Sequence, residues 1–295
     1  MALEPSPMVA PDVVDPTSPA SPVPPPDGRT AALFLLAAFA WSWACWGLGA
    51  LRADGPVTAA ALGGWLFAAA FGPALGAVLA LALTRGGAGV RALFACIARV
   101  DLGWSTWLLA LYHAAPFALL ALLAFSLGHT RDAIGTSALL FFLPLIAVFS
   151  LLPGPLGGEP GWRGLLLPVL LTRFAPLPAA LLVGLVWAAW QAPLWWLDDL
   201  RWGLALAQFV PVQVFTLLAM SLILAVFHLR SGGSLALSVM IHAAFVAVLG
   251  PFVNLAGRGM LLVAPVLAYA LALTAAAVVL TWWHRGLLIP HRQGR

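Results

Sequence analysis

Long apolar runs are the feature of this sequence that most limits its possible folds. With 63% hydrophobic and only 8% charged residues, the 295-residue chain cannot hide its apolar surface in a water-soluble globule. Only helices and closed β-barrels can cross a bilayer, and the apolar runs are close to the ~20 residues of a spanning helix, which favours helices. The sequence therefore predicts an all-α, polytopic membrane protein with about eight transmembrane helices, at 31–51, 60–84, 105–127, 136–153, 177–197, 205–228, 234–253 and 261–283.

The two ends of the chain differ from this apolar middle. Residues 1–28 hold many Pro, Ser and Asp residues and no apolar run, a composition that favours a disordered cytoplasmic tail. We expect a transmembrane domain over 29–285 and a basic cytoplasmic tail over 286–295. Between the second and third runs, 86–100 mixes arginines with apolar residues, the pattern of a short helix lying in the membrane interface.

The charges indicate orientation and exclude some partners. All 14 basic residues are arginines, and an eight-span arrangement puts ten on the side of the termini against four on the other. This bias predicts that both termini are cytoplasmic. Arginine without lysine, together with much Ala, Gly and Pro, suggests a GC-rich bacterial genome and hence a bacterial cell membrane. The net charge of +4 comes from scattered arginines and indicates no nucleic-acid surface. Cys45 and Cys96 suggest neither a disulfide framework nor a thiolate metal site.

Polar side chains in or beside three of the apolar runs need an explanation, because a charge at the centre of a spanning helix costs about 2.5–3.5 kcal/mol. Glu159 and Arg163 are four residues apart, so on a helix they share a face and can pair. Gln191 lies in the fifth run and His242 in the seventh. Each has a structural alternative to catalysis: an ion pair for the first two, and hydrogen bonds between helices for the others.

The segments around these residues resemble the CPBP family of intramembrane proteases, which includes the CaaX prenyl endopeptidases and the bacterial Abi proteins. The family pattern is E-E-x-x-x-R, then an aromatic residue and a His with three residues between them, then H-x-x-x-N or H-x-x-x-D. Here the matching segments are GEPGWRGLLLP, WAAWQAPLWW and RSGGSLALSVMIHAAF, in the same order. Residues beside the motifs agree with the family as well, namely Gly164, Pro193 and 231–234. The resemblance covers about residues 60–250.

The resemblance implies an intramembrane endopeptidase with a membrane peptide or protein as its substrate, working in a membrane cavity open to the cytoplasm. In the family a glutamate activates water with help from histidines, and His and Asn stabilise the oxyanion. Glu159 matches the second Glu of the pattern, Arg163 the Arg, and His242 the third-motif His. Together with Gln191, at the second-motif His position, they are the candidate catalytic residues.

Three positions depart from the family pattern, because Gly158, Gln191 and Val246 stand where the first Glu, the second-motif His and the third-motif Asn are expected. Losing a general base costs about 10²–10⁴ in rate, and losing an oxyanion donor about 10²–10³. Two interpretations stay open: an endopeptidase of reduced activity, or an inactive member that binds membrane peptides as an adaptor or immunity protein. Neighbouring helical residues point about 100° apart, so Glu159 is expected to face away from the site of the first Glu.

The few polar residues also bear on cofactor use and on transport as an alternative function. We expect no cofactor, because only Glu159 and His242 remain as good zinc ligands, short of the usual three of a catalytic site, although a divalent metal held partly through water stays open. A small-solute transporter is a third alternative. It would need a polar path across the bilayer, whereas the polar residues gather towards one end of three helices.

Overall fold

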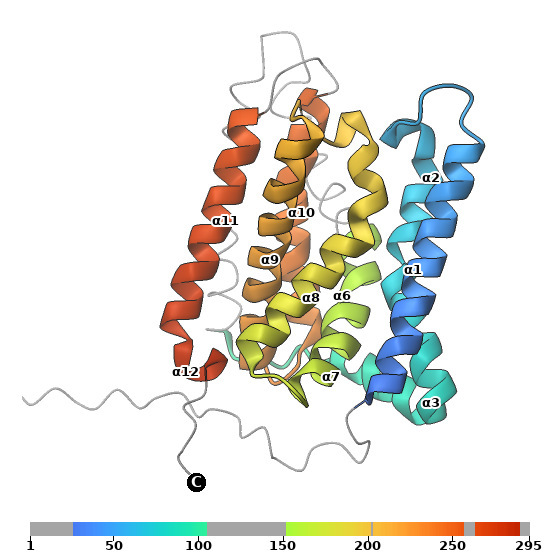
Figure 1. The fold of residues 1–295 in the computed structure, drawn as a ribbon. Coiled ribbons are helices and arrows are strands. Elements are labelled where there is room, and N and C mark those ends of the chain that lie inside the picture. The colour runs from blue at the N-terminus through green and yellow to red at the C-terminus, as the bar shows by residue number, and fades with distance from the viewer. Residues whose placement is uncertain (1–25, 105–151, 202, 257–262, 290–295) are drawn as a thin grey trace, which may run out of the picture.

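The computed structural model describes residues 26–104, 152–201, 203–256 and 263–289. Over these ranges the secondary structure is helical without strands, and Figure 1 shows the long helices side by side in a bundle. Five helical stretches in this part of the chain are long and apolar enough to cross a bilayer, which confirms an all-α, polytopic membrane fold: Gly28–Leu51, Ala59–Ile97, Pro176–Trp196, Leu206–Arg230 and Val266–Trp283. The predicted runs 105–127 and 136–153 fall wholly or almost wholly outside the described residues.

Helix α1 (Gly28–Leu51) begins one residue before the predicted start of the membrane domain. The Asp27 carboxylate caps it, accepting a hydrogen bond from the Thr30 backbone N–H at 2.8 Å and another from the Thr30 hydroxyl at 2.7 Å. These hydrogen bonds stabilise the ionised form, so the pKa of Asp27 is lowered from its ordinary value. Residues 1–25 of the predicted tail lie outside the described ranges.

Helices α2 (Ala59–Ala70) and α3 (Gly72–Ile97) return beside α1 and pack against it through small residues. A Cβ atom added at Gly76 would come within 2.9 Å of the Ala38 nitrogen, so the two backbones are in close contact. The buried Ser42 hydroxyl also donates to the Ala69 carbonyl at 2.7 Å. Close backbone approach and hydrogen bonds between helices are the usual means of packing where lipid removes the hydrophobic drive between helices.

Gly86 interrupts α3, since its φ of 63° and ψ of −159° are outside the helical range. Glycine adopts a positive φ without the steric cost that a Cβ atom brings. The break separates the membrane-spanning part of α3 from a final stretch that ends at Ile97. That stretch covers most of 86–100, where the sequence predicts a separate short helix.

A continuous helical segment, which we call the split helix, runs from Leu152 to Leu171. Two wider π-helical turns alternate in it with α-helical turns: η1 (Leu152–Leu156), α6 (Gly157–Gly161), η2 (Trp162–Leu166) and α7 (Leu167–Leu171). Prolines lack an N–H and clash with the preceding turn of an α-helix, and π turns are one way for a helix to accommodate such an interruption. The sequence prediction ended the fourth run at 153, whereas helical structure continues for more than four further turns.

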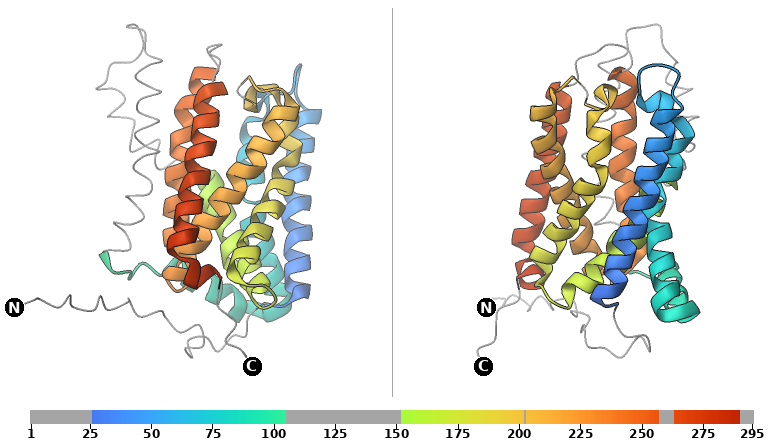
Figure 2. Two further views of the ribbon diagram at one scale, coloured as in Figure 1. Left: turned by 60° about the vertical axis from the view of Figure 1, so that its left-hand side comes forward. Right: turned by 45° about the vertical axis from the view of Figure 1, so that its right-hand side comes forward.

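The remaining helices complete the bundle: α8 (Pro176–Gln191), the 3₁₀ turns η3 (Ala192–Trp196) and η4 (Asp198–Leu200), α9 (Leu206–Arg230), α10 (Leu235–Ala256), α11 (Val263–Trp283) and α12 (Arg285–Leu288). Helix α9 packs against α8 and α11 and also contacts α10. Both views of Figure 2 show α9 among these neighbours, with α1 and α3 on the side of the bundle away from α11. Helix α12 begins at the last residue of the predicted membrane domain and continues into the predicted C-terminal tail.

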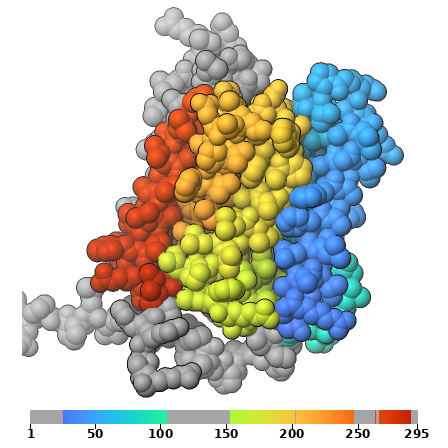
Figure 3. Space-filling view, in the orientation of Figure 1, coloured from blue at the N-terminus to red at the C-terminus, as the bar shows by residue number. Residues whose placement is uncertain are grey.

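The outer surface of the bundle is apolar. Helices α1 and α11 form the two flanks of the face in Figure 3, and large hydrophobic side chains such as Leu36 and Leu271 are 70% exposed. Exposed apolar surface of this extent fits contact with lipid. In contrast, the charged pair Glu159 and Arg163 is fully buried inside the bundle.

Candidate active site

The split helix brings Glu159 and Arg163 together. Arg163 Nη1 donates to Glu159 Oε1 at 3.1 Å, and both side chains are 0% exposed. The pairing predicted from their four-residue spacing is therefore present. Glu159 lies in α6, which packs on α3 and α10, and Arg163 lies in the π turn that follows.

His242 joins this pair from α10. Its Nδ1 lies 2.7 Å from Glu159 Oε1, and an ionised carboxylate can only accept, so Nδ1–H is the donor. The neutral imidazole then carries its lone pair on Nε2. A Cβ atom built at Gly154 would lie 3.8 Å from that nitrogen, so no side chain from the split helix covers it there.

Three atoms of the buried pair have no hydrogen-bond partner among the described residues: Glu159 Oε2, Arg163 Nε and Arg163 Nη2. The Arg163 guanidinium carbon lies 5.0 Å from the centre of the Trp187 ring, a cation–π contact that stabilises a buried cation. The same ring meets the His242 imidazole edge-on at 5.0 Å. Trp187 therefore holds both basic side chains in place from α8.

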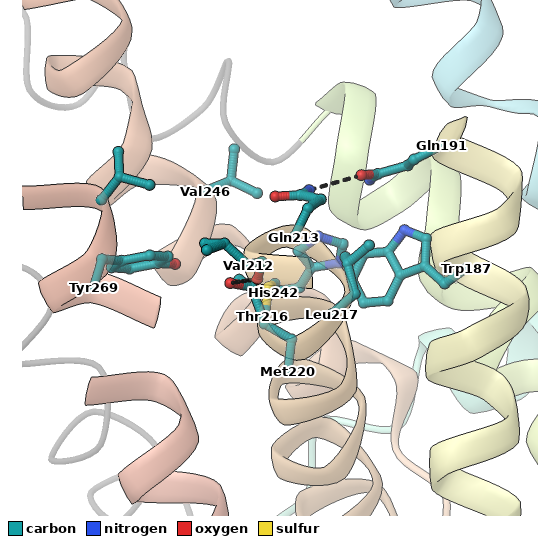
Figure 4. A pocket seen from close by; sticks show the side chains of 11 residues that line it. Trp187, Gln191, Val212, Gln213, Thr216, Leu217, Met220, His242, Val246 and Tyr269 are labelled. Carbon is teal, nitrogen blue, oxygen red and sulfur yellow. Dashed lines mark hydrogen bonds between the residues drawn. The ribbon is translucent and has the colours of Figure 1, made fainter. Parts of the chain in front are cut away.

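A cavity of about 90 Å³ lies between α8, α9, α10 and α11 and includes His242 in its wall. Figure 4 shows its lining side chains, which are Trp187, Gln191, Val212, Gln213, Thr216, Leu217, Met220, His242, Val246, Val266 and Tyr269. None of them carries a permanent charge. The cavity therefore places the free nitrogen of His242 beside uncharged side chains.

Gln191 lies in this cavity without a direct hydrogen bond to Glu159 or His242. Its side-chain carbonyl instead accepts from Gln213 Nε2 at 3.0 Å, joining α8 to α9 (Figure 4). Sequence reasoning overlooked Gln213, which belongs to no motif. The available signal was an amide side chain within a membrane-spanning run, a position where polar residues are rare and often functional.

The three departures from the family pattern all face the same imidazole or its cavity. A Cβ atom at Gly158 would lie 3.9 Å from His242 Cε1, and Val246 lines the cavity one turn beyond His242. Positions 158 and 159 thus lie near adjacent atoms of one imidazole ring. The carboxylate at 159 reaches the ring because four bonds separate its oxygens from the Cα atom.

The donor set does not fit a catalytic metal ion. In the parts of the chain that the structure describes, no three His, Cys, Asp or Glu side chains come together in a way that could hold one. Of the two candidate ligands, Glu159 Oε1 already accepts from both Arg163 and His242. Two ligands are fewer than the three that catalytic zinc sites use.

Comparison with known families bears on this arrangement. Residues 139–248 match the sequence model of the family described as type II CAAX prenyl endopeptidase Rce1-like. This matched segment, which we call the CPBP segment, supports the resemblance to the CPBP family. The match includes the split helix, α8, α9 and the part of α10 that carries His242, so all the polar positions discussed above lie within the CPBP segment. A search of curated proteins finds no match to the chain.

Proposed function

We propose that this protein is an intramembrane endopeptidase of the CPBP type in which His242 activates water and Glu159 orients the His242 imidazole. The observation that carries this proposal is the 2.7 Å hydrogen bond from His242 Nδ1 to the buried carboxylate of Glu159, made by an imidazole in a cavity wall. A carboxylate that binds one imidazole nitrogen fixes the tautomer and raises the basicity of the other.

The reaction needs one base and one later acid, and a single imidazole supplies both. His242 Nε2 takes a proton from water while the water oxygen attacks the carbonyl carbon of the substrate peptide bond. The imidazolium that forms is stabilised by Glu159. The imidazolium then gives its proton to the leaving amine nitrogen as the carbon–nitrogen bond breaks, which restores the neutral ring.

Arg163 acts through Glu159 in this proposal. Its guanidinium lies 3.1 Å from the carboxylate and supplies the countercharge that a buried carboxylate needs. Gln191 cannot accept the proton of a water molecule, and Val246 has no hydrogen-bond donor. We therefore expect slow turnover, because a general base at 158 and an oxyanion donor at 246 would each contribute about 10²-fold or more.

A second candidate function is favoured by the chemistry of positions 158, 191 and 246, none of which has a titratable side chain. In this alternative the CPBP cavity binds a membrane peptide without cutting it, as an adaptor or immunity protein. The Glu159–Arg163–His242 cluster would then be a structural network that connects the split helix to α10. Both candidates share a peptide in the bilayer as the partner.

Cleavage of a mixed peptide library by the purified protein in lipid bilayers distinguishes the two. We expect slow cleavage that His242→Ala abolishes and Glu159→Gln reduces by at least about 10²-fold, since the amide cannot stabilise an imidazolium as a carboxylate does. Met240→Ala is the matched control, because Met240 lies on the same helix and is 49% exposed. Cleavage that survives both site substitutions rules out the proposed mechanism. No cleavage by folded protein favours the peptide-binding alternative.

We also propose that both termini are cytoplasmic. In Figure 1 the first turn of α1 and the last turn of α11 lie at one end of the bundle. Exposed arginines gather at that end: Arg29 lies in the first turn of α1, Arg99 follows the end of α3, and Arg173 lies beside Gly28. Arg52, in contrast, follows the last residue of α1 at the other end. This distribution fits the preference of cytoplasmic segments for arginine, and reporter fusions to each terminus in a bacterial membrane test it.

A further inference from the structure

Two glutamine side chains face each other in the wall of the cavity, and the water activation described above uses neither. Gln213 Nε2 of α9 donates to Gln191 Oε1 of α8 at 3.0 Å, and both residues are half-buried. Figure 4 shows the paired amides with their backbones on separate helices, in the same chamber as His242.

This hydrogen bond uses only part of what the two amides offer. It occupies the carbonyl of Gln191 and one N–H of Gln213, so the Gln191 amino group and the Gln213 carbonyl have no further partner among the described residues. The pair therefore presents one donor group and one acceptor group to the chamber. If both amides are flipped, donor and acceptor change places and the pair still presents one of each.

The rest of the chamber offers little that could replace these groups for an incoming ligand. Its wall is mainly apolar, and the Thr216 hydroxyl is already bonded to the Val212 carbonyl of its own helix at 2.8 Å. Burying a peptide N–H and C=O in such a place without partners is costly. The N–H and C=O of one residue in an extended chain are the complement of the glutamine pair, because both groups project to the same side of the chain.

We propose that the Gln191–Gln213 pair binds the main chain of one residue in an extended, uncharged substrate segment, with that residue's C=O on Gln191 and its N–H on Gln213. This assignment rests on the proposed function, in which the cavity receives a membrane peptide. The lining has no permanent charge to neutralise a terminal carboxylate or ammonium group. The pair therefore selects an internal stretch of chain with neutral side chains rather than a charged chain end.

A depsipeptide scan tests the assignment. The probe is a short fluorescent peptide of alanine and leucine, blocked at both ends, whose peptide bonds are replaced by esters one at a time. Each ester removes a single N–H. Affinity for the protein in nanodiscs is measured by fluorescence anisotropy, with peptide integrity followed in parallel so that binding and cleavage are recorded separately.

One ester position is expected to weaken binding to the native protein about fivefold, the effect of losing a typical hydrogen bond. In Gln213→Met the same ester should cause no loss, because the acceptor is gone while side-chain size and helix propensity are kept. Thr216→Val, on the same wall, should keep the fivefold penalty. Gln191→Met provides a second test if Gln213→Met does not fold, since it leaves Gln213 without its orienting partner and should also shrink the penalty.

The outcomes separate this inference from the proposed function. An ester penalty that disappears in the glutamine variants, with no cleavage of any probe, supports peptide binding by the pair and counts against the endopeptidase. No ester penalty in the native protein, an equal penalty in Gln213→Met and Gln191→Met, or no binding of the probe overturns the inference. A merely structural bridge between α8 and α9 would change stability in the variants and leave the ester penalty the same.

Discussion

Removing the Glu159 carboxylate should destabilise the protein more than removing both charges of its pair. In Glu159→Gln the Arg163 guanidinium remains 0% exposed without its neighbouring countercharge. At an effective dielectric constant of about 20, the attraction across 3.1 Å is about 5 kcal/mol. Breaking one side of a buried pair costs about 3–5 kcal/mol in general, so we expect a loss of that size in the free energy of unfolding.

The double variant Glu159→Gln with Arg163→Met should recover part of that loss. Replacing both members of a buried ion pair is often neutral or stabilising, because the desolvation cost of two charges disappears together. We therefore expect the double variant to be more stable than Glu159→Gln alone by at least about 2 kcal/mol.

Unfolding by SDS in mixed micelles, followed by the fluorescence of the 14 tryptophans, measures this cycle. Asp198→Asn is the control, because Asp198 pairs with Arg201 but its side chain is 87% exposed. Its loss should cost less than about 1 kcal/mol. Additive effects in the cycle, or a cost for Glu159→Gln as small as that of the control, would refute the buried-pair argument.

Two further predictions follow from the glycines of the bundle. Gly161→Ala should lower the free energy of unfolding by about 1–3 kcal/mol, because its Cβ atom would lie 2.6 Å from the Pro73 carbonyl oxygen. The control Gly64→Ala should be neutral or slightly stabilising, because its Cβ atom meets nothing within 4 Å. Equal effects of the two substitutions in the same SDS titration would contradict this prediction. Gly158→Glu combined with Gln191→His should raise peptide cleavage by about 10²-fold or more, since a side chain at 158 starts 3.9 Å from the His242 ring. Its Cβ atom would also lie 3.3 Å from the Trp162 ring, which must shift slightly to make room. An unchanged rate in the library assay counts against a vacant base position.

The spanning helices could be predicted from sequence because hydropathy and length decide them almost alone. The run 205–228 corresponds to α9, Leu206–Arg230, and the run 177–197 to α8 with its final 3₁₀ turn. The split helix could not be predicted in the same way. Its prolines and glycines read locally as helix breakers, and π turns together with packing on α3 and α10 hold the segment in helical form.

The candidate site, too, could be predicted from the sequence only in part. The spacing of Glu159 and Arg163 predicted their contact, and the resemblance to CPBP proteins grouped them with His242. Glu159 was expected to face away from the site of the first Glu, and its carboxylate contacts His242 from the same turn that carries position 158. Gln213 has no motif and gains its partner only through the crossing of α8 and α9, which depends on tertiary packing.

The placement of both charges of the buried pair on one short segment has a consequence for how the protein is made. A segment carrying a lone carboxylate or guanidinium would resist transfer into the bilayer during synthesis. Because Glu159 and Arg163 are one helical turn apart, they neutralise each other as soon as that turn forms, before α10 has been synthesised. The polar cluster can therefore enter the membrane as an electrically neutral unit, and His242 joins it later, when the seventh apolar run arrives.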